Sequence, residues 1–126
     1  MSLTLRVLPG ELTVVRLPPD SRIPAWLPLS YQPLTSVTIT DKELSIICPS
    51  PVVPVGLTAE PGYRVLRVED KLEFSAIGVL SSILNPLAAA GVNILSLSTF
   101  DTDYILVPSS KLEAALAALR PHFQLS

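Results

Sequence analysis

Proline is distributed very unevenly along this chain of 126 residues, and the distribution limits what the first half can form. Residues 1–62 hold ten of the thirteen prolines, so the apolar segments between them are short. Because proline lacks a backbone N–H, it ends helices and interrupts central strands. We therefore expect short strands at "LTLRVL", "LTVVRL", "TSVTIT" and "LSIICP", with "TDKE" at residues 40–43 joining the last two as a hairpin.

The second half has a different pattern, in which strands alternate with helices. Residues 49–62, "PSPVVPVGLTAEPG", are predicted to lack regular structure and to mark the boundary between a domain at 1–62 and one at 63–126. Strands are expected at 63–70, 92–99 and 103–107. A helix is expected at 77–90, ended by Gly91, and a second helix should begin at a capping box of Ser110 and Glu113. The apolar stripe of the first helix comprises Ile77, Leu80, Ile83, Leu84, Leu87 and Ala88.

The order strand, helix, strand, strand, helix is one strand short of a ferredoxin-like βαββαβ unit. The residues "HFQLS" after Pro121 are short for the missing strand. The N-terminal strand, Leu3 to Leu8, is predicted to complete the second sheet, so that the two halves interlock. We predict an α+β fold of two interlocked ferredoxin-like units, with antiparallel sheets and helices on one face.

Composition and missing motifs exclude several classes of function. The net charge is −2 and the nine basic residues are scattered, which argues against nucleic acid and anionic membranes as partners. No apolar run approaches the roughly 20 residues of a membrane span. A single cysteine, Cys48, fits a buried position in a cytoplasmic protein, and a single histidine, His122, leaves no zinc-ligand cluster. With no phosphate loop or nucleophile elbow, we expect no catalysis, no metal and no cofactor.

Residues 72–107, "LEFSAIGVLSSILNPLAAAGVNILSLSTFDTDYILV", resemble the ACT domain, a ferredoxin-like module that binds amino acids and similar small effectors. They are similar in particular to paired-ACT proteins related to the arginine-sensing proteins of the animal growth-control pathway. The resemblance extends over residues 63–120, and over the first half it rests only on strand order. It implies a non-catalytic regulatory protein, a ligand sensor whose effector binds between ACT units. It also implies an oligomer, either a homodimer or a complex with a partner protein through ACT sheets.

The resemblance places the effector between the loop "EFSAIG" and the turn "STFDTDY". A helix N-terminus carries about half a positive charge and suits a carboxylate, and Gly78 permits close approach. Opposite it, Asp101 is predicted to receive an ammonium group, while Asp103 fixes the hairpin as a structural turn residue. The predicted ligand-binding residues are Ser75, Ala76, Ile77, Gly78, Ser81, Asn93, Ile94, Phe100, Asp101 and Thr102.

These residues also have purely structural interpretations. Gly78 can serve tight helix packing, Ser75 can be a helix N-cap, Ser81 can face solvent, and Asn93 can bind turn carbonyls. Asp and Thr are ordinary turn formers, so "FDTD" alone is typical of a structural turn. Ile77 stands where related sequences often carry threonine, which leaves the identity of the effector open.

Two other functions stay open at this stage. A protein interaction module without a ligand would use Trp26 as an anchor, although Trp26 equally suits a plug of the core. An enzyme of unrecognised type is the third candidate, and no constellation of residues supports it.

Overall fold

The computed structural model describes residues 3–73 and 77–126, which divide into two compact units. The first, here called the helical unit, combines Met1–Leu8 with Arg64–Ser126. The second, here called the proline-rich unit, is the continuous segment Pro9–Tyr63. The helical unit is therefore assembled from both ends of the sequence.

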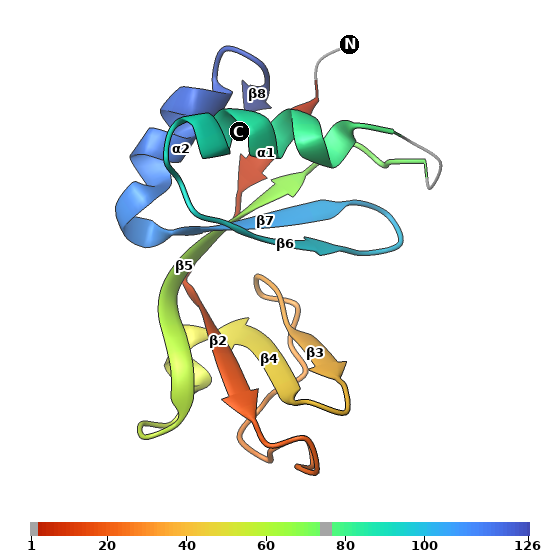
Figure 1. The fold of residues 1–126 in the computed structure, drawn as a ribbon, viewed down its shortest axis with the longest axis vertical. Helices are drawn as coiled ribbons and strands as arrows, with labels where there is room; N and C mark the ends of the chain where they lie inside the picture. The colour runs from red at the N-terminus through yellow and green to blue at the C-terminus, as the bar shows by residue number, and fades with distance from the viewer. Residues whose placement is uncertain (1–2, 74–76) are drawn as a thin grey trace. The chain divides into compact units, whose positions relative to one another are not determined.

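The regular elements follow one another in chain order (Figure 1). They are β1 (Thr4–Val7), β2 (Leu12–Leu17), β3 (Ser36–Ile39), β4 (Leu44–Pro49), the 3-10 helix η1 (Ser50–Val52), β5 (Thr58–Val68), α1 (Val79–Ala89), β6 (Leu95–Ser98), β7 (Asp103–Pro108), the 3-10 helix η2 (Ser109–Lys111), α2 (Leu112–Leu119) and β8 (Gln124–Leu125).

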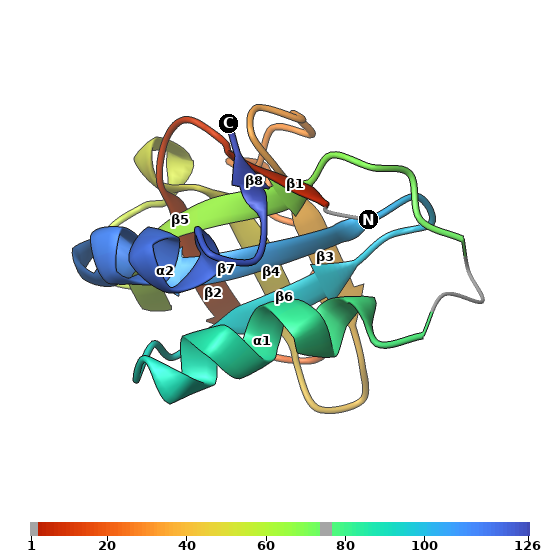
Figure 2. The ribbon, with the colours of Figure 1, turned by 90° about the horizontal axis from the view of Figure 1, so that it is seen from above.

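The elements from β5 to β8 have the ferredoxin-like order βαββαβ, and the predicted α+β class is confirmed. In the sheet of the helical unit the strands lie in the order β6, β7, β5, β1, β8, and Figure 2 shows β1, β5, β7 and β6 side by side. The N-terminal strand β1 pairs antiparallel with β5, with Leu5 opposite Val68. The short β8 pairs parallel with β1 on its other side. Strand β1 therefore lies between β5 and the last strand of the ferredoxin-like order.

Helices α1 and α2 cover the same face of this sheet (Figure 1). Ile83 and Leu87 of α1 and Leu119 of α2 are fully buried, and they share one core with Leu5 of β1 and Ile105 of β7. Burying such side chains is worth about 1.5–3 kcal/mol each. Neither helix of the described residues is long and apolar enough to cross a membrane.

The C-terminal end of α1 was predicted correctly from the sequence, and its N-terminal end was not. Gly91 has a φ of 73°, and the amide of Val92 donates to the carbonyl of Leu87 at 2.9 Å, which is the expected left-handed C-terminal cap. The predicted start at residue 77 is wrong, because Gly78 is left-handed at φ 80° and α1 begins only at Val79. Ile77 is accordingly outside the helix and 96% exposed. Ala88, also assigned to the apolar stripe, is exposed.

Two further predictions are corrected in the second half. No side chain caps the start of α2, so Ser110 and Glu113 do not form the predicted capping box. The 3-10 turn η2 directly precedes α2 and takes the place of a capped start. Strand β6 is also shorter than residues 92–99, because the Gly91 cap continues into buried Val92 before the strand begins at Leu95.

The segment at residues 49–62 was wrongly predicted to lack regular structure, because β5 already begins at Thr58. Proline at position 61 is tolerated through a break in the ladder between β2 and β5. The register shifts between the pairs Leu12–Tyr63 and Val14–Glu60, and Gly62 has a φ of 83° there. A β-bulge of this kind leaves residues outside the hydrogen-bond ladder, so the missing N–H of proline costs little.

The proline-rich unit is a sheet of β3, β4, β2 and the first part of β5, without an α-helix in its residues. Its core includes Val15, Ile46 and Cys48, and half-buried Trp26 packs against that core. Burial raises the pKa of the Cys48 thiol, which keeps it protonated at neutral pH. Trp26 therefore serves as a core plug here.

Candidate functional site

A cleft of about 420 Å³ lies within the helical unit, where the start of α1 faces the turn between β6 and β7. It is lined by residues 78–81, residues 98–103, Leu72 and Glu73. The volume falls within the range of about 300–1,000 Å³ that is usual for small-molecule sites.

The start of α1 supplies backbone donors to the cleft. Its first helical bond runs from the amide of Ser82 to the carbonyl of Gly78 at 3.0 Å. The amides of the first turn, from Val79 to Ser81, precede that bond and have no partner within the helix. A Cβ atom on Gly78 would meet Ser81 Oγ at 3.8 Å, an ordinary contact. Glycine is therefore favoured there by its positive φ rather than by lack of space.

The turn on the opposite wall is closed by its own residues. The amide and the hydroxyl of Thr99 both donate to the carbonyl of Thr102, at 2.9 and 3.2 Å. Just outside the turn, the hydroxyl of Ser98 donates to Asp103 Oδ1 at 2.6 Å, across the last pair of β6 and β7. These bonds fix the hairpin without using the carboxylate of Asp101.

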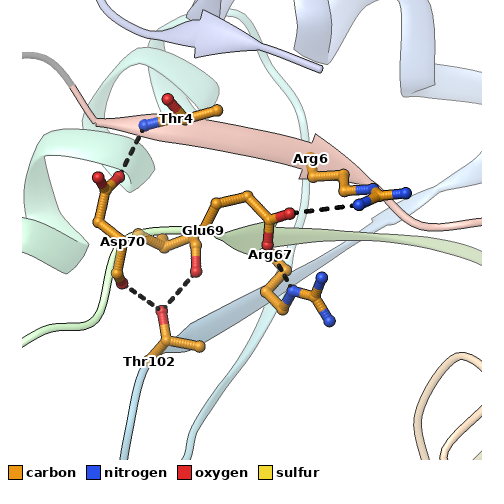
Figure 3. A network of polar contacts seen from close by, with 7 residues as sticks. Thr4, Arg6, Arg67, Glu69, Asp70 and Thr102 are labelled. Atoms are coloured by element: carbon orange, nitrogen blue, oxygen red, sulfur yellow. Dashed lines mark hydrogen bonds and ion pairs between the residues drawn. The ribbon is translucent and has the colours of Figure 1, made fainter.

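The turn is also fastened to the end of β5. Thr102 Oγ1 donates to the carbonyl of Val68 at 2.7 Å and lies 3.4 Å from that of Asp70. Figure 3 shows Thr102 beside Asp70, with these contacts as dashed lines. The amide of Leu72 donates to the carbonyl of Asp101 at 2.9 Å. The Asp101 carboxylate is largely exposed, 4.0 Å from Lys71 Nζ. It is consequently accessible to a bound molecule.

Charge is distributed asymmetrically around the cleft. Glu73, Asp101 and Asp103 contribute carboxylates, and none of the described lining residues is basic. The positive pole is instead the N-terminus of α1. Within residues 3–73 and 77–126, no three His, Cys, Asp or Glu side chains gather in a way that could hold a metal.

A separate charged network lies at the end of β5 (Figure 3). Glu69 contacts Arg67 Nε at 2.7 Å and Arg6 at 3.6 Å. The hydrogen bond from Arg67 lowers the pKa of the Glu69 carboxyl, and the same bond raises the pKa of Arg67. Asp70 Oδ2 accepts the amide of Thr4 at 2.9 Å, which ties the first residue of β1 to this corner.

The structure brings part of the predicted set together. Gly78, Ser81, Phe100, Asp101 and Thr102 all line the cleft, as does Asp103.

Three predicted residues do not line the cleft. Ile94 packs against the core, and Asn93 and Ile77 are exposed. The predicted contacts Ser75 and Ala76 lie outside the described residues. Six lining residues were missed, although each lies in or within two residues of one of the two segments singled out in the sequence. They are Leu72, Glu73, Val79, Leu80, Ser98 and Thr99.

Comparison with known proteins identifies the family. A family model described as the ACT domain matches residues 58–121, just over half of the chain. The chain belongs to the ACT domain family. A second model, which describes an N-terminal domain, matches residues 10–55. The ACT match covers both walls of the cleft, and no curated protein matches the sequence.

Several solved structures are similar to this ACT protein. A protein of Agobacterium tumefaciens is 31% identical with a TM-score of 0.91, and the match covers 100% of this chain and 93% of that one. A Vibrio cholerae protein, described as a possible transport protein, is 17% identical with a TM-score of 0.75, over 95% and 89% of the two chains. The regulatory subunit of aspartate kinase from Thermus thermophilus is 11% identical with a TM-score of 0.58, over 91% and 94%. The Vibrio cholerae and Thermus thermophilus structures are 17% and 11% identical to this chain, so their similarity establishes a shared fold only.

Proposed function

We propose that this ACT protein is a non-catalytic sensor that binds an amino acid in the cleft of the helical unit. One observation carries the proposal: Gly78, at the start of α1, and Asp101, in the opposite turn, line the same cleft. A positive and a negative pole facing one another match the two charged groups that every free amino acid carries. The proposed contacts include Ser81 and Phe100 on the same walls.

The two poles assign an orientation to the effector. Its carboxylate would accept hydrogen bonds from the amides of Val79 and Leu80, which have no partner within the helix, and the helix dipole adds to the strength of these bonds. Its ammonium group would lie against the exposed carboxylate of Asp101. Glu73 and Asp103 add negative charge to the lining, so a neutral or basic side chain is favoured over an acidic one.

A regulatory role is supported by the aspartate kinase regulatory subunit among the similar folds. We propose that the protein assembles through its ACT unit, as a homodimer or with a partner protein in the cytoplasm. An effector that binds one assembled state more tightly than another shifts the balance between them.

A thermal-shift panel of the common amino acids tests this function. A ligand that binds only the folded protein stabilises it by about 2.7 kcal/mol at a concentration of 100 times its Kd. We expect a dose-dependent rise in Tm with at least one neutral or basic amino acid, and none with aspartate or glutamate. The absence of any rise at millimolar concentrations would overturn the proposal.

One observation favours a second function, a protein interaction module without a ligand. In the proline-rich unit, Leu29 and Tyr31 are 82% and 81% exposed. Large apolar side chains that extend into solvent mark a surface that binds proteins where they form one contiguous patch. If no amino acid of the thermal-shift panel raises the Tm, this function is favoured over the sensor.

A further inference from the structure

We infer that Thr102 is a positioning residue of the cleft, which holds Asp101 in place and does not itself contact the effector. This inference rests on the proposed function. It assigns to Thr102 a role different from the direct ligand contact predicted from the sequence.

The hydroxyl of Thr102 is already committed within the protein. A threonine hydroxyl has one hydrogen to donate. Thr102 donates it to the carbonyl of Val68 at 2.7 Å, and the carbonyl of Asp70 lies further away at 3.4 Å (Figure 3). The residue is also only 9% exposed. No hydrogen is left to donate to a molecule in the cleft.

This bond attaches the turn to β5 at a point where regular strand pairing has ended. Strand β7 begins at Asp103, so Thr102 is the residue immediately before the ladder. Its hydroxyl bonds to Val68, the last residue of β5. The hairpin is therefore attached to β5 one residue before β7 begins. The turn that lines the cleft opposite the start of α1 is consequently held from the β5 side.

Asp101 depends on this attachment because its carboxylate has no close contact of its own among the bonds described above. The carboxylate is 66% exposed and lies 4.0 Å from Lys71 Nζ, which is itself 79% exposed. An exposed pair at this distance contributes little to holding a side chain. The position of Asp101 is therefore set by its backbone, through the bond from the amide of Leu72 and through Thr102 next to it.

Three variants of the full chain test the inference. Thr102→Val keeps the shape of the side chain and removes the hydroxyl, whereas Thr102→Ser keeps the hydroxyl and removes the methyl group. Thr13→Val is the matched control, because Thr13 is the other buried polar residue of the described chain and its hydroxyl bonds to Ser50 Oγ at 2.8 Å. The probe is the amino acid that gives the largest rise in Tm with the wild-type protein.

We expect Thr102→Val to weaken binding of that amino acid by about tenfold, the equivalent of one hydrogen bond. Thr102→Ser should stay within about threefold of wild type, and Thr13→Val should bind normally even though its Tm falls as well. If Thr102→Val does not fold, Thr102→Cys replaces it, since a thiol is only a weak donor. Wild-type affinity in the variant that lacks the hydroxyl would overturn the inference.

Hydrogen exchange in the protein without ligand separates positioning from direct contact. The amides of Leu72 and Thr99 donate to Asp101 and Thr102, so both should exchange faster in Thr102→Val than in Thr102→Ser or Thr13→Val. Unchanged exchange together with weakened binding would mean that Thr102 contacts the effector directly, and would overturn the positioning role. Wild-type protein that binds none of the common amino acids would instead overturn the proposed function itself.

Discussion

Two hairpin turns among the described residues are closed by the same pair of hydrogen bonds but differ in their surroundings. In the proline-rich unit, the amide and hydroxyl of Thr40 both donate to the carbonyl of Glu43, at 3.0 and 3.3 Å. In the helical unit, Thr99 makes the same two bonds to Thr102. Each turn also contains an aspartate, Asp41 in one and Asp101 in the other.

What differs is the rest of the unit around each turn. The fourth residue of the helical unit's turn, Thr102, is buried and bonded to the end of β5, and the start of α1 faces that turn across a cleft. The turn at Thr40 instead uses its hydroxyl for itself, accepting the amides of Lys42 and Glu43 at 3.1 and 3.2 Å. Turn residues therefore acquire a candidate function from their neighbours in space, not from their own sequence.

The largest expected difference between the turns concerns their aspartates. Asp101→Asn should abolish detectable effector binding, because a hydrogen bond to a charged group is worth about 1.5–3 kcal/mol. Its stability should change by less than about 0.5 kcal/mol, since the side chain is exposed. Asp41→Asn should alter neither property. Titration calorimetry and chemical denaturation measure both, and unchanged affinity in Asp101→Asn would reject the assignment.

The two units can also be compared by replacing one left-handed glycine in each of them with alanine. Gly78 and Gly56 have φ values of 80° and 89°. Alanine at either position should cost about 1–2 kcal/mol in unfolding free energy. Only Gly78→Ala adds a methyl group to the cleft wall, so only this variant should also bind the effector more weakly. Equal affinities for the two variants would argue against ligand approach at Gly78.

Because Thr40 and Thr99 close their turns in the same way, replacing either one should lower the free energy of unfolding. The two decreases should differ in size. Thr40→Val should cost about 1 kcal/mol, because three hydrogen bonds involve the hydroxyl. Thr99→Val removes a single bond and should cost less. Urea denaturation of the two variants measures the difference. A larger loss for Thr99→Val would show that the two turns do not share the same closure.

The smallest expected effect is a dependence of stability on pH that arises from Glu69 of the helical unit. Arg67 lowers the pKa of Glu69 in the folded protein below the unfolded value of about 4.3. The stabilisation is present at neutral pH and is lost as the pH falls through the lowered pKa of Glu69. Glu69→Gln should therefore lower stability by less than about 1 kcal/mol at pH 7 and flatten its acid dependence. An unchanged acid profile would contradict this.

Local patterns predicted several elements of the fold correctly. Apolar spacing identified Ile83 and Leu87 as buried positions of α1, and Gly91 was identified as its cap. The extension of β5 through Pro61 was not predictable, because the bulge that tolerates proline depends on pairing with β2. The start of α1 was misplaced because Gly78 lies just before it in a left-handed conformation.

The candidate site was only partly visible in the sequence. The sequence singled out "FDTD" and "EFSAIG", and the cleft is lined by all of the first and by Glu73 and Gly78 of the second. The burial of Thr102 and its bond to Val68 could not be read from the turn, since they depend on a strand 34 residues earlier in the chain. Propensities describe the turn itself, while its anchoring is a property of the sheet.

The most direct test of the sensor compares both turns in one experiment. Amide resonances of the wild-type protein are followed by NMR while the common amino acids are added one at a time at millimolar concentration. We predict saturable shifts at Gly78, Val79 and Asp101 with at least one amino acid, and none at Asp41 or Lys42. No shift with any amino acid, or shifts confined to residues outside the cleft, would contradict the account.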